Sequence, residues 1–184
     1  MNHQTDEQLV DELKNGNRAA FDFLFDRYAK KAEYYFYRML WSNEEKAADF
    51  TQDLFLKVLE KIDLYKTEYS FKTWFFSMAN NMYKNEYRKE EVKTKANGHL
   101  KIVANTISYN GGDLATDQNK FNEVLFKNLD SFSEEKKTAF ILKYIDDVPL
   151  QEISEILGIP IGTVKSGLHY TTKILAEILK PFKP

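Results

Sequence analysis

Residues 150–175 read Leu150-Gln-Glu-Ile-Ser-Glu-Ile-Leu-Gly-Ile-Pro-Ile-Gly-Thr-Val-Lys-Ser-Gly-Leu-His-Tyr-Thr-Thr-Lys-Ile-Leu175. Apolar residues recur three and four positions apart on both sides of Gly158, which predicts two amphipathic helices with a turn between them. Pro160 suits the first turn of the second helix, because proline lacks the N–H that would be unpaired there. We therefore expect a helix, a tight turn and a second helix.

The second helix of this segment divides into an apolar side and a polar side. Val164, Leu168 and Leu175 form the apolar stripe that we expect to be buried. In a helix-turn-helix the second helix lies in the major groove of DNA, with its N-terminal residues on the base edges. An ordinary helical hairpin has the same spacing, so the pattern alone leaves both interpretations open. The polar side chains expected to face DNA are Thr163, Lys165, Ser166, His169, Tyr170 and Lys173.

The wider segment, residues 143–172, resembles the C-terminal domain of one family along its whole length and without a gap. That family is the bacterial sigma factors, specifically the extracytoplasmic-function (ECF) group of the sigma-70 family. Pro149 stands where the family has a capping serine, although Glu152 keeps the partner position of the capping box. The family usually has arginines at three positions that differ here, namely Gly167, Tyr170 and Thr172.

Three segments of the N-terminal half resemble the same family and occur in the family's order. They are residues 17–28, residues 48–57 and residues 70–81. The resemblance covers most of the chain and misses only the stretch near residues 92–120. It implies a transcription initiation factor that binds core RNA polymerase, recognises the promoter minus-35 and minus-10 elements and promotes DNA melting.

Three polar residues, Asp49, Gln52 and Asp53, lie off the apolar stripe of the helix expected around residues 50–62. Acidic side chains on an exposed helix face are usually only solvated. The resemblance implies a binding role, because the matching residues in the family dock onto the clamp helices of the polymerase β′ subunit. The implied contacts with core RNA polymerase are these clamp helices and the β flap. Complementary charge would fix the register of the contact on the clamp helices.

The helix that begins near Phe71, and the loop of residues 63–69 before it, correspond to the part of the family that opens the minus-10 element and captures a flipped base. Asparagine side chains read base edges, lysine and arginine bind phosphates, and tyrosine stacks on unpaired bases. A tyrosine in a short loop is also commonly a packing residue. The residues expected to contact minus-10 DNA are Tyr65, Lys66, Tyr69, Lys72, Asn80, Asn81, Lys84, Asn85, Arg88 and Lys89.

The whole chain predicts an all-α fold, because no alternating strand pattern is present. Capping-box patterns at residues 5–8 and 42–45 indicate two helix starts. Residues 91–120 lack helical periodicity and contain Asn-Gly and Gly-Gly steps, so we expect a flexible linker there. We therefore expect two small helical domains, residues 1–90 and 121–184, with the helix-turn-helix in the second. Two helices should bury apolar stripes, formed by Phe50, Leu54, Val58 and Ile62 and by Phe71, Trp74, Phe75, Met78 and Met82.

Charge is distributed unevenly along the chain, whose formal net charge is −2. Residues 70–101 hold seven basic and three acidic side chains, whereas residues 1–69 hold ten basic and fourteen acidic ones. A local basic contact zone for nucleic acid fits this distribution better than a uniform basic coat. A solvated basic helix end is the alternative.

Composition restricts the location and the chemistry of this 184-residue chain. The lack of cysteine excludes disulfides and thiolate metal sites and suits a reducing compartment. No segment approaches the roughly 20 apolar residues that span a bilayer, and the polar first residues show no signal peptide. We expect a cytoplasmic protein without direct membrane insertion. His3, His99 and His169 lack ligand spacing, so no metal, cofactor or catalytic residue is predicted, and an enzyme is not expected.

Two other non-enzymatic interpretations compete with a sigma factor. One is a free-standing helix-turn-helix regulator, which would have no use for Asp49, Gln52 and Asp53 followed by the segment at residues 70–81. The other is an adaptor that has lost DNA affinity, suggested by the missing arginines. Factors of this group are commonly held inactive by an anti-sigma factor, so such a partner is possible.

Overall fold

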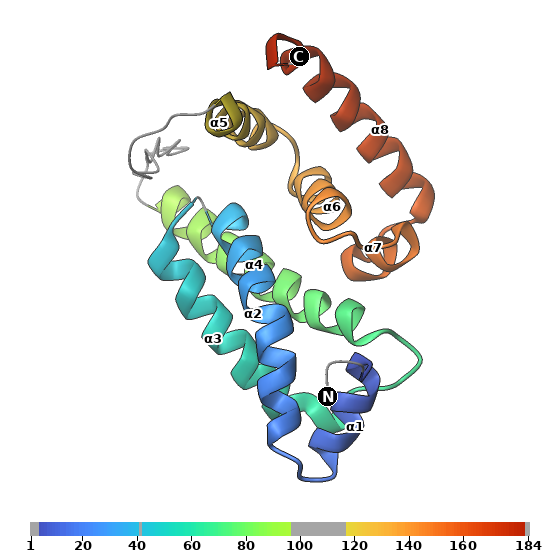
Figure 1. The fold of residues 1–184 in the computed structure, drawn as a ribbon. Coiled ribbons are helices and arrows are strands. Elements are labelled where there is room, and N and C mark those ends of the chain that lie inside the picture. The colour runs from blue at the N-terminus through green and yellow to red at the C-terminus, as the bar shows by residue number, and fades with distance from the viewer. Residues whose placement is uncertain (1–3, 41, 97–116, 183–184) are drawn as a thin grey trace. The chain divides into compact units, whose positions relative to one another are not determined.

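The computed structural model describes residues 4–40, 42–96 and 117–182 (Figure 1). Every regular element within these ranges is a helix, which confirms the all-α prediction. The chain divides into two compact units, Met1–Asn105 and Thr106–Pro184, called here the N-terminal unit and the C-terminal unit. Each unit is described by itself.

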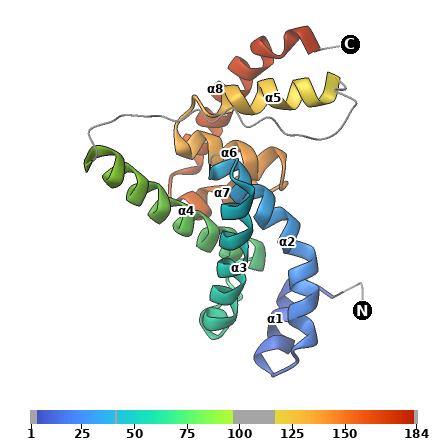
Figure 2. The same cartoon turned by 90° about the vertical axis from the view of Figure 1, so that its left-hand side faces the viewer.

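Helix α2 is the element against which the N-terminal unit assembles. Helix α3 runs along α2, and α1 and α4 pack against α2 from other sides (Figure 2). Within the described residues the elements of this unit are α1 (Asp6–Lys14), α2 (Ala19–Met39), α3 (Glu44–Lys61), the 3-10 turn η1 (Ile62–Leu64) and α4 (Phe71–Ala96).

Aromatic side chains fill the core of the N-terminal unit. The ring of Phe75 on α4 is fully buried. Its centroid lies 4.9 Å from that of Tyr28 on α2, 5.4 Å from Phe55 on α3 and 5.8 Å from Phe71. Each such pair contributes about 0.5–1.5 kcal/mol beyond the area it buries. One ring thus joins three helices.

The buried side of α4 is rotated relative to the predicted stripe. Phe71 and Phe75 are buried as expected, but so are Phe76, Ala79 and Tyr83. The other three predicted stripe residues are only half-buried, namely Trp74, Met78 and Met82. The rotation arises because α4 contacts α1, α2 and α3, so a wider arc than one stripe is covered.

One of the two predicted helix caps is confirmed and the other is displaced by one residue. Thr5 and Gln8 form the capping box of α1, with bonds of 3.2 Å from the Gln8 amide and 2.9 Å to the Gln8 side chain. The second start was expected at Ser42. Asn43 caps α3 instead, and its Oδ1 accepts from the Lys46 amide at 2.8 Å. Ser42 has φ of 56°, so it belongs to the turn before the cap.

A polar cluster fastens α1 to α2. The Arg27 guanidinium lies 2.7 Å from the Asp6 carboxylate and also donates to the carbonyl of Gln4 at 2.7 Å. The Tyr28 hydroxyl donates to the other Asp6 oxygen. Burial, followed by the hydrogen bond to Asp6, raises the pKa of Tyr28 above its ordinary value, so the hydroxyl remains a donor.

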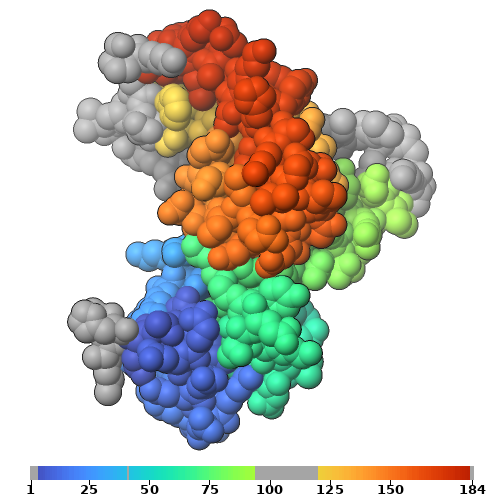
Figure 3. All heavy atoms as spheres, turned by 90° about the vertical axis from the view of Figure 1, so that its right-hand side faces the viewer, coloured from blue at the N-terminus to red at the C-terminus, as the bar shows by residue number. Residues whose placement is uncertain are grey.

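The C-terminal unit consists of a helix pair, the helix-turn-helix, around which two further helices pack. Gly158 ends α7 in the left-handed conformation at φ of 67°, and Pro160 precedes α8, as predicted. Helix α8 packs against α5, α6 and α7. In Figure 3 the orange-to-red atoms of α6, α7 and α8 form a continuous surface of this unit. The described elements are α5 (Asp117–Leu129), α6 (Glu134–Tyr144), α7 (Leu150–Leu157), α8 (Ile161–Ile178) and the 3-10 turn η2 (Lys180–Phe182).

The predicted linker of residues 91–120 is too long at both ends. Helix α4 continues to Ala96, and α5 already begins at Asp117. Periodicity missed the end of α4 because the sequence of residues 91–96 has no apolar stripe, and Glu91, Val92 and Lys93 are exposed. The remainder of the predicted linker, residues 97–116, lies outside the described residues.

Loss of the Asp6 carboxylate should loosen the N-terminal unit. We expect Asp6→Ala to lower the free energy of unfolding by about 2 kcal/mol, because the Tyr28 hydroxyl loses its acceptor and an ion pair is broken. Urea unfolding followed by tryptophan fluorescence reports on this unit alone, since Trp41 and Trp74 both belong to it. Asp26→Ala, at an exposed aspartate of α2, should change stability by less than about 0.5 kcal/mol. Equal losses in both variants would contradict the role of Asp6.

Candidate nucleic-acid and protein interfaces

The three residues predicted to bind polymerase share one exposed face of α3. Asp49, Gln52 and Asp53 are exposed, opposite the side on which Leu54 and other residues pack into the core. The helix places them one turn apart or less, so the fold brings them together. This agrees with the sequence interpretation of where they lie, while their binding role stays a prediction.

Leu56 is a residue of this face that sequence reasoning missed. Its side chain is 57% exposed and lies one helical turn beyond Gln52 and Asp53. The available signal was its position off the stripe of Leu54 and Val58, which are fully buried. An exposed apolar side chain beside polar ones is typical of the centre of a protein contact.

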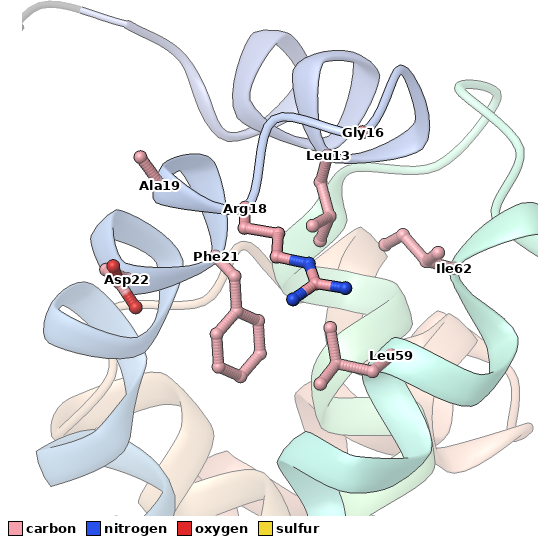
Figure 4. Close-up of a pocket in the computed structure, with 8 residues that line it drawn as sticks. All are labelled: Leu13, Gly16, Arg18, Ala19, Phe21, Asp22, Leu59 and Ile62. Atoms are coloured by element: carbon pink, nitrogen blue, oxygen red, sulfur yellow. The ribbon is translucent and has the colours of Figure 1, made fainter.

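An open cleft of about 700 Å³ lies between α1, the start of α2 and the end of α3 (Figure 4). The Arg18 guanidinium points into it, toward Leu59 and Ile62. Leu59 is 40% exposed and follows Gln52 by two turns of α3, so the cleft adjoins the face just described. The residues that line it are Leu13, Gly16, Arg18, Ala19, Phe21, Asp22, Leu59 and Ile62.

The prediction that Tyr65 stacks on an unpaired base is wrong for this conformation, because the side chain is only 3% exposed. Its ring packs 5.3 Å from that of Trp74, and its hydroxyl donates to the carbonyl of Tyr69 at 2.8 Å. Burial, together with the carboxylates of Glu7 and Asp11, raises the pKa of Tyr65 to about 12. Tyr65 therefore shapes the loop, whereas Tyr69, at 50% exposure, presents its ring to solvent.

Helix α1 holds this loop at both ends. The Lys14 ammonium donates to the carbonyl of Tyr65 at 2.9 Å and lies over the Tyr65 ring. The Glu7 carboxylate accepts from the amide of Phe71 at 3.2 Å, where the first amides of α4 have no partner within the helix. Ser70 accepts from the Thr73 amide at 3.1 Å at the same helix end. Contacts over 51 and 64 residues of sequence could not be predicted from local spacing.

The prediction that Asn80 contacts minus-10 DNA is also wrong for this conformation. Asn80 is 1% exposed, and the Tyr35 hydroxyl lies 3.4 Å from its Oδ1 inside the core. The rotation of α4 is the reason, because it turns this position toward α2. Asn80 therefore cannot reach a base edge in this conformation.

The remaining predicted minus-10 residues are accessible. Asn81, Asn85 and Arg88 are exposed on successive turns of α4, so they form one row. Lys84 beside this row is half-buried. The other accessible members are exposed Lys66 in the loop, half-buried Lys72, and exposed Lys89, which lies 3.7 Å from the Glu86 carboxylate.

An ion pair fixes the basic part of α4 to the start of α3. The Lys46 ammonium lies 2.7 Å from Glu86 and 4.0 Å from Glu90. The hydrogen bond from Lys46 lowers the pKa of the Glu86 carboxyl, whose side chain is only 14% exposed. Glu86 thus faces α3, so its carboxylate does not lie in the exposed row formed by Asn81, Asn85 and Arg88.

All six residues predicted to contact minus-35 DNA are exposed on α8. The apolar stripe of Val164, Leu168 and Leu175 is buried as predicted. Tyr170 is 52% exposed, and its ring meets that of Phe132 edge-on at 6.3 Å. The exposed six are Thr163, Lys165, Ser166, His169, Tyr170 and Lys173.

Each of the two units matches a known protein family. Residues 24–92 match the family Sigma-70 region 2, and residues 129–169 match the family Sigma-70, region 4. The two matches together span more than half of the chain and fall in separate units. The chain belongs to the sigma-70 family. Region 2 therefore comprises most of α2, all of α3 and nearly all of α4, and region 4 comprises α6, α7 and the first half of α8.

Relatives place this sigma factor in the ECF group. It is 29% identical over 182 residues to the ECF RNA polymerase sigma factor SigW of Bacillus subtilis, covering 93% of this chain and 95% of that protein. It is 26% identical over 186 residues to the ECF RNA polymerase sigma-E factor of Haemophilus influenzae, covering 96% of each. The protein is thus a transcription initiation factor, as the sequence predicted.

Solved structures share its fold. The sigma factor RpoE, in complex with the anti-sigma factor NepR from Bartonella quintana, has a TM-score of 0.72 at 22% identity, covering 87% of this chain and 96% of that one. CnrH, in complex with the cytosolic domain of CnrY, has a TM-score of 0.69 at 17% identity, covering 97% and 99%. Among the described residues of this sigma factor, no helix is long and apolar enough to cross a membrane.

The Lys46–Glu86 pair should make the stability of the N-terminal unit depend on pH. Because the pKa of Glu86 is lowered in the folded state, its stabilising effect is present above the ordinary value of 4.5 and is lost as the pH falls through the folded value. We expect Glu86→Gln to cost about 1 kcal/mol at pH 7 and to be nearly neutral in strong acid. Urea unfolding at several pH values measures this, with Glu60→Gln at an exposed site as control. A cost for Glu86→Gln that does not change with pH would refute it.

Proposed function

We propose that the α3 face formed by Asp49, Gln52, Asp53 and Leu56, called here the α3 face, binds the β′ clamp helices of core RNA polymerase. Leu56 supplies the apolar centre, and the acids around it supply charge complementarity and register. The single observation that carries this proposal is the 57% exposure of Leu56 in the middle of an ordered helix. The resemblance to the family supports this proposal. It also implies a second contact on polymerase, with the β flap.

We further propose that region 2 binds and melts the minus-10 element. The row of Asn81, Asn85 and Arg88 offers amides for base edges and a guanidinium for phosphate. Tyr69 is the aromatic side chain that the loop before α4 leaves exposed, so it replaces Tyr65 as the residue that stacks on an unpaired base. The cations proposed to meet phosphates beside this row are Lys66, Lys72, Lys84 and Lys89.

We propose that the exposed side of α8 binds the minus-35 element in the major groove. The six side chains proposed to make this contact are Thr163, Lys165, Ser166, His169, Tyr170 and Lys173. The factor would act in the cytoplasm as a specificity subunit, while the polymerase supplies the catalysis. RpoE and CnrH are in complex with other proteins in their structures, NepR being an anti-sigma factor. We propose that an anti-sigma factor also regulates this chain.

Transcription from a promoter library tests the central proposal. The full-length chain is mixed with bacterial core RNA polymerase and a library of random upstream sequences, and the transcribed templates are sequenced. Enrichment of paired minus-35 and minus-10 elements supports initiation. A chain that binds DNA but never polymerase would indicate a free-standing regulator, and a chain that binds polymerase without selecting templates would indicate an adaptor.

Charge reversal on the α3 face should weaken polymerase binding without unfolding the protein. We expect Asp49→Lys with Asp53→Lys, or Leu56→Asp alone, to reduce affinity for core RNA polymerase at least tenfold, because a hot-spot side chain contributes about 2 kcal/mol or more. Titration with fluorescent sigma factor measures it, and unfolding curves check the fold. Glu155→Lys with Glu177→Lys, at exposed positions of α7 and α8 outside the α3 face, should bind normally. Unchanged affinity of the α3 variants would exclude this face.

Loss of the exposed ring should impair melting more than initial binding. We expect Tyr69→Ala to reduce the permanganate-reactive bubble several-fold while closed complexes persist, because stacking contributes about 1–3 kcal/mol per base. Tyr65→Ala should instead lower the stability of the N-terminal unit by about 3–5 kcal/mol, because it empties a buried aromatic site. Tyr144→Ala, at an exposed tyrosine of region 4, is the control. An unaltered bubble with Tyr69→Ala would refute the assignment.

A further inference from the structure

A lysine of α6 lies on the exposed surface of α8, the second helix of the helix-turn-helix. The ammonium of Lys136, on α6, is 4.5 Å from the centroid of the Tyr170 ring on α8. Phe132 meets the same ring edge-on at 6.3 Å, so Tyr170 is held between the two. A cation over an aromatic face at this distance is attracted to the ring, which restrains the long lysine side chain.

Gly167 provides the space for this arrangement. A Cβ atom added at Gly167 would lie 3.5 Å from Cγ of Lys136, in ordinary van der Waals contact, so the lysine stem passes over Gly167 with room for little more than a methyl group. A long side chain at this position would compete with the stem for the same surface. Gly167 and Tyr170 are two of the positions at which the family usually has arginines, so Lys136 lies where those cations are missing.

The part of the α8 row that Lys136 reaches, from Thr163 to Tyr170, has no charge of its own. Thr163, Gly167 and Tyr170 recur four and three residues apart and therefore share one side of the helix. Lys165 and Lys173 are the cations of α8 itself, and they lie on neighbouring rows. A cation on the uncharged row must therefore come from a neighbouring helix.

Of the adjacent lysines Lys136 and Lys137, Lys136 is the one that remains available to a ligand. The next residue, Lys137, is buried and forms an ion pair with Asp130. Lys136 has no carboxylate within ion-pair distance among the residues that the structure describes. Its charge is therefore not neutralised within that part of the protein.

We propose that Lys136 belongs to the DNA-binding surface of region 4, where it binds a backbone phosphate beside the minus-35 element in place of the absent arginines. A phosphate contact fixes the register of a protein on the duplex without reading sequence. The proposal rests on the proposed function of α8 as the minus-35 reader. It assigns part of the affinity of that surface to α6.

Salt dependence tests the proposal on the holoenzyme with the promoter recovered from the library. We expect Lys136→Met, which keeps an unbranched apolar stem, to weaken binding several-fold and to lower the slope of log affinity against log salt by about 0.9, the value for one phosphate contact. Lys127→Met removes the same charge from an exposed site on α5 and should leave the slope unchanged. A slope that is unchanged by Lys136→Met, or equally changed by Lys127→Met, would overturn the proposal.

A swap and a proximity measurement separate a phosphate contact from a structural role. Lys136→Met combined with Gly167→Arg should restore the slope, because the cation then comes from α8; no restoration would count against the proposal. Because the chain has no cysteine, Lys136→Cys alone can carry an iron chelate that cleaves nearby DNA. Cleavage at the minus-35 element supports the proposal, and its absence overturns it. If the wild-type holoenzyme selects no promoter, it is the proposed function that fails.

Discussion

The aromatic packing around Phe75 is the constraint on which the N-terminal unit depends. Because its ring touches Tyr28 of α2, Phe55 of α3 and Phe71 of α4, the rotation of each helix about its axis is fixed. Interiors packed this densely do not allow a helix to turn without leaving a void. The outward side of α3, with Leu56 among acids, follows from this core rather than from any interaction on the surface.

The loop before α4 depends on the same core but is held by polar groups. Its exposed tyrosine, Tyr69, is positioned by a hydrogen bond from buried Tyr65, and Tyr65 is in turn held by Lys14 of α1. Glu7 of α1 caps the helix that follows. A side chain that is proposed to capture a base gains from such support, because less conformational freedom remains to be lost on binding. Helix α1 precedes the segment matched to region 2, yet it organises the loop of region 2.

Local pattern predicted the helices, the division into two units and the helix-turn-helix, because each is encoded within a few turns of sequence. Gly158 and Pro160 illustrate this, since their conformational preferences are intrinsic. The failures have a common cause. Tyr65 and Asn80 are polar or amphipathic residues whose burial depends on partners far away in sequence, and their side chains satisfy hydrogen bonds inside the unit. Leu56 was missed for the opposite reason, since an apolar residue is expected to be buried.

The proposed DNA-binding surface of region 4 draws its cations from two helices, α8 and α6. The sequence of α8 itself supplies two lysines, whereas in the structure Lys136 of α6 also lies over the exposed Tyr170 ring of α8. Even with a third cation this surface carries few charges, and each adds only about 0.9 to the salt slope. Region 2 and region 4 are parts of one chain, so once polymerase binds, each raises the effective concentration of the other at its promoter element. We therefore expect two individually weak contacts to suffice, and weak contacts would favour the release of an initiation factor from its promoter.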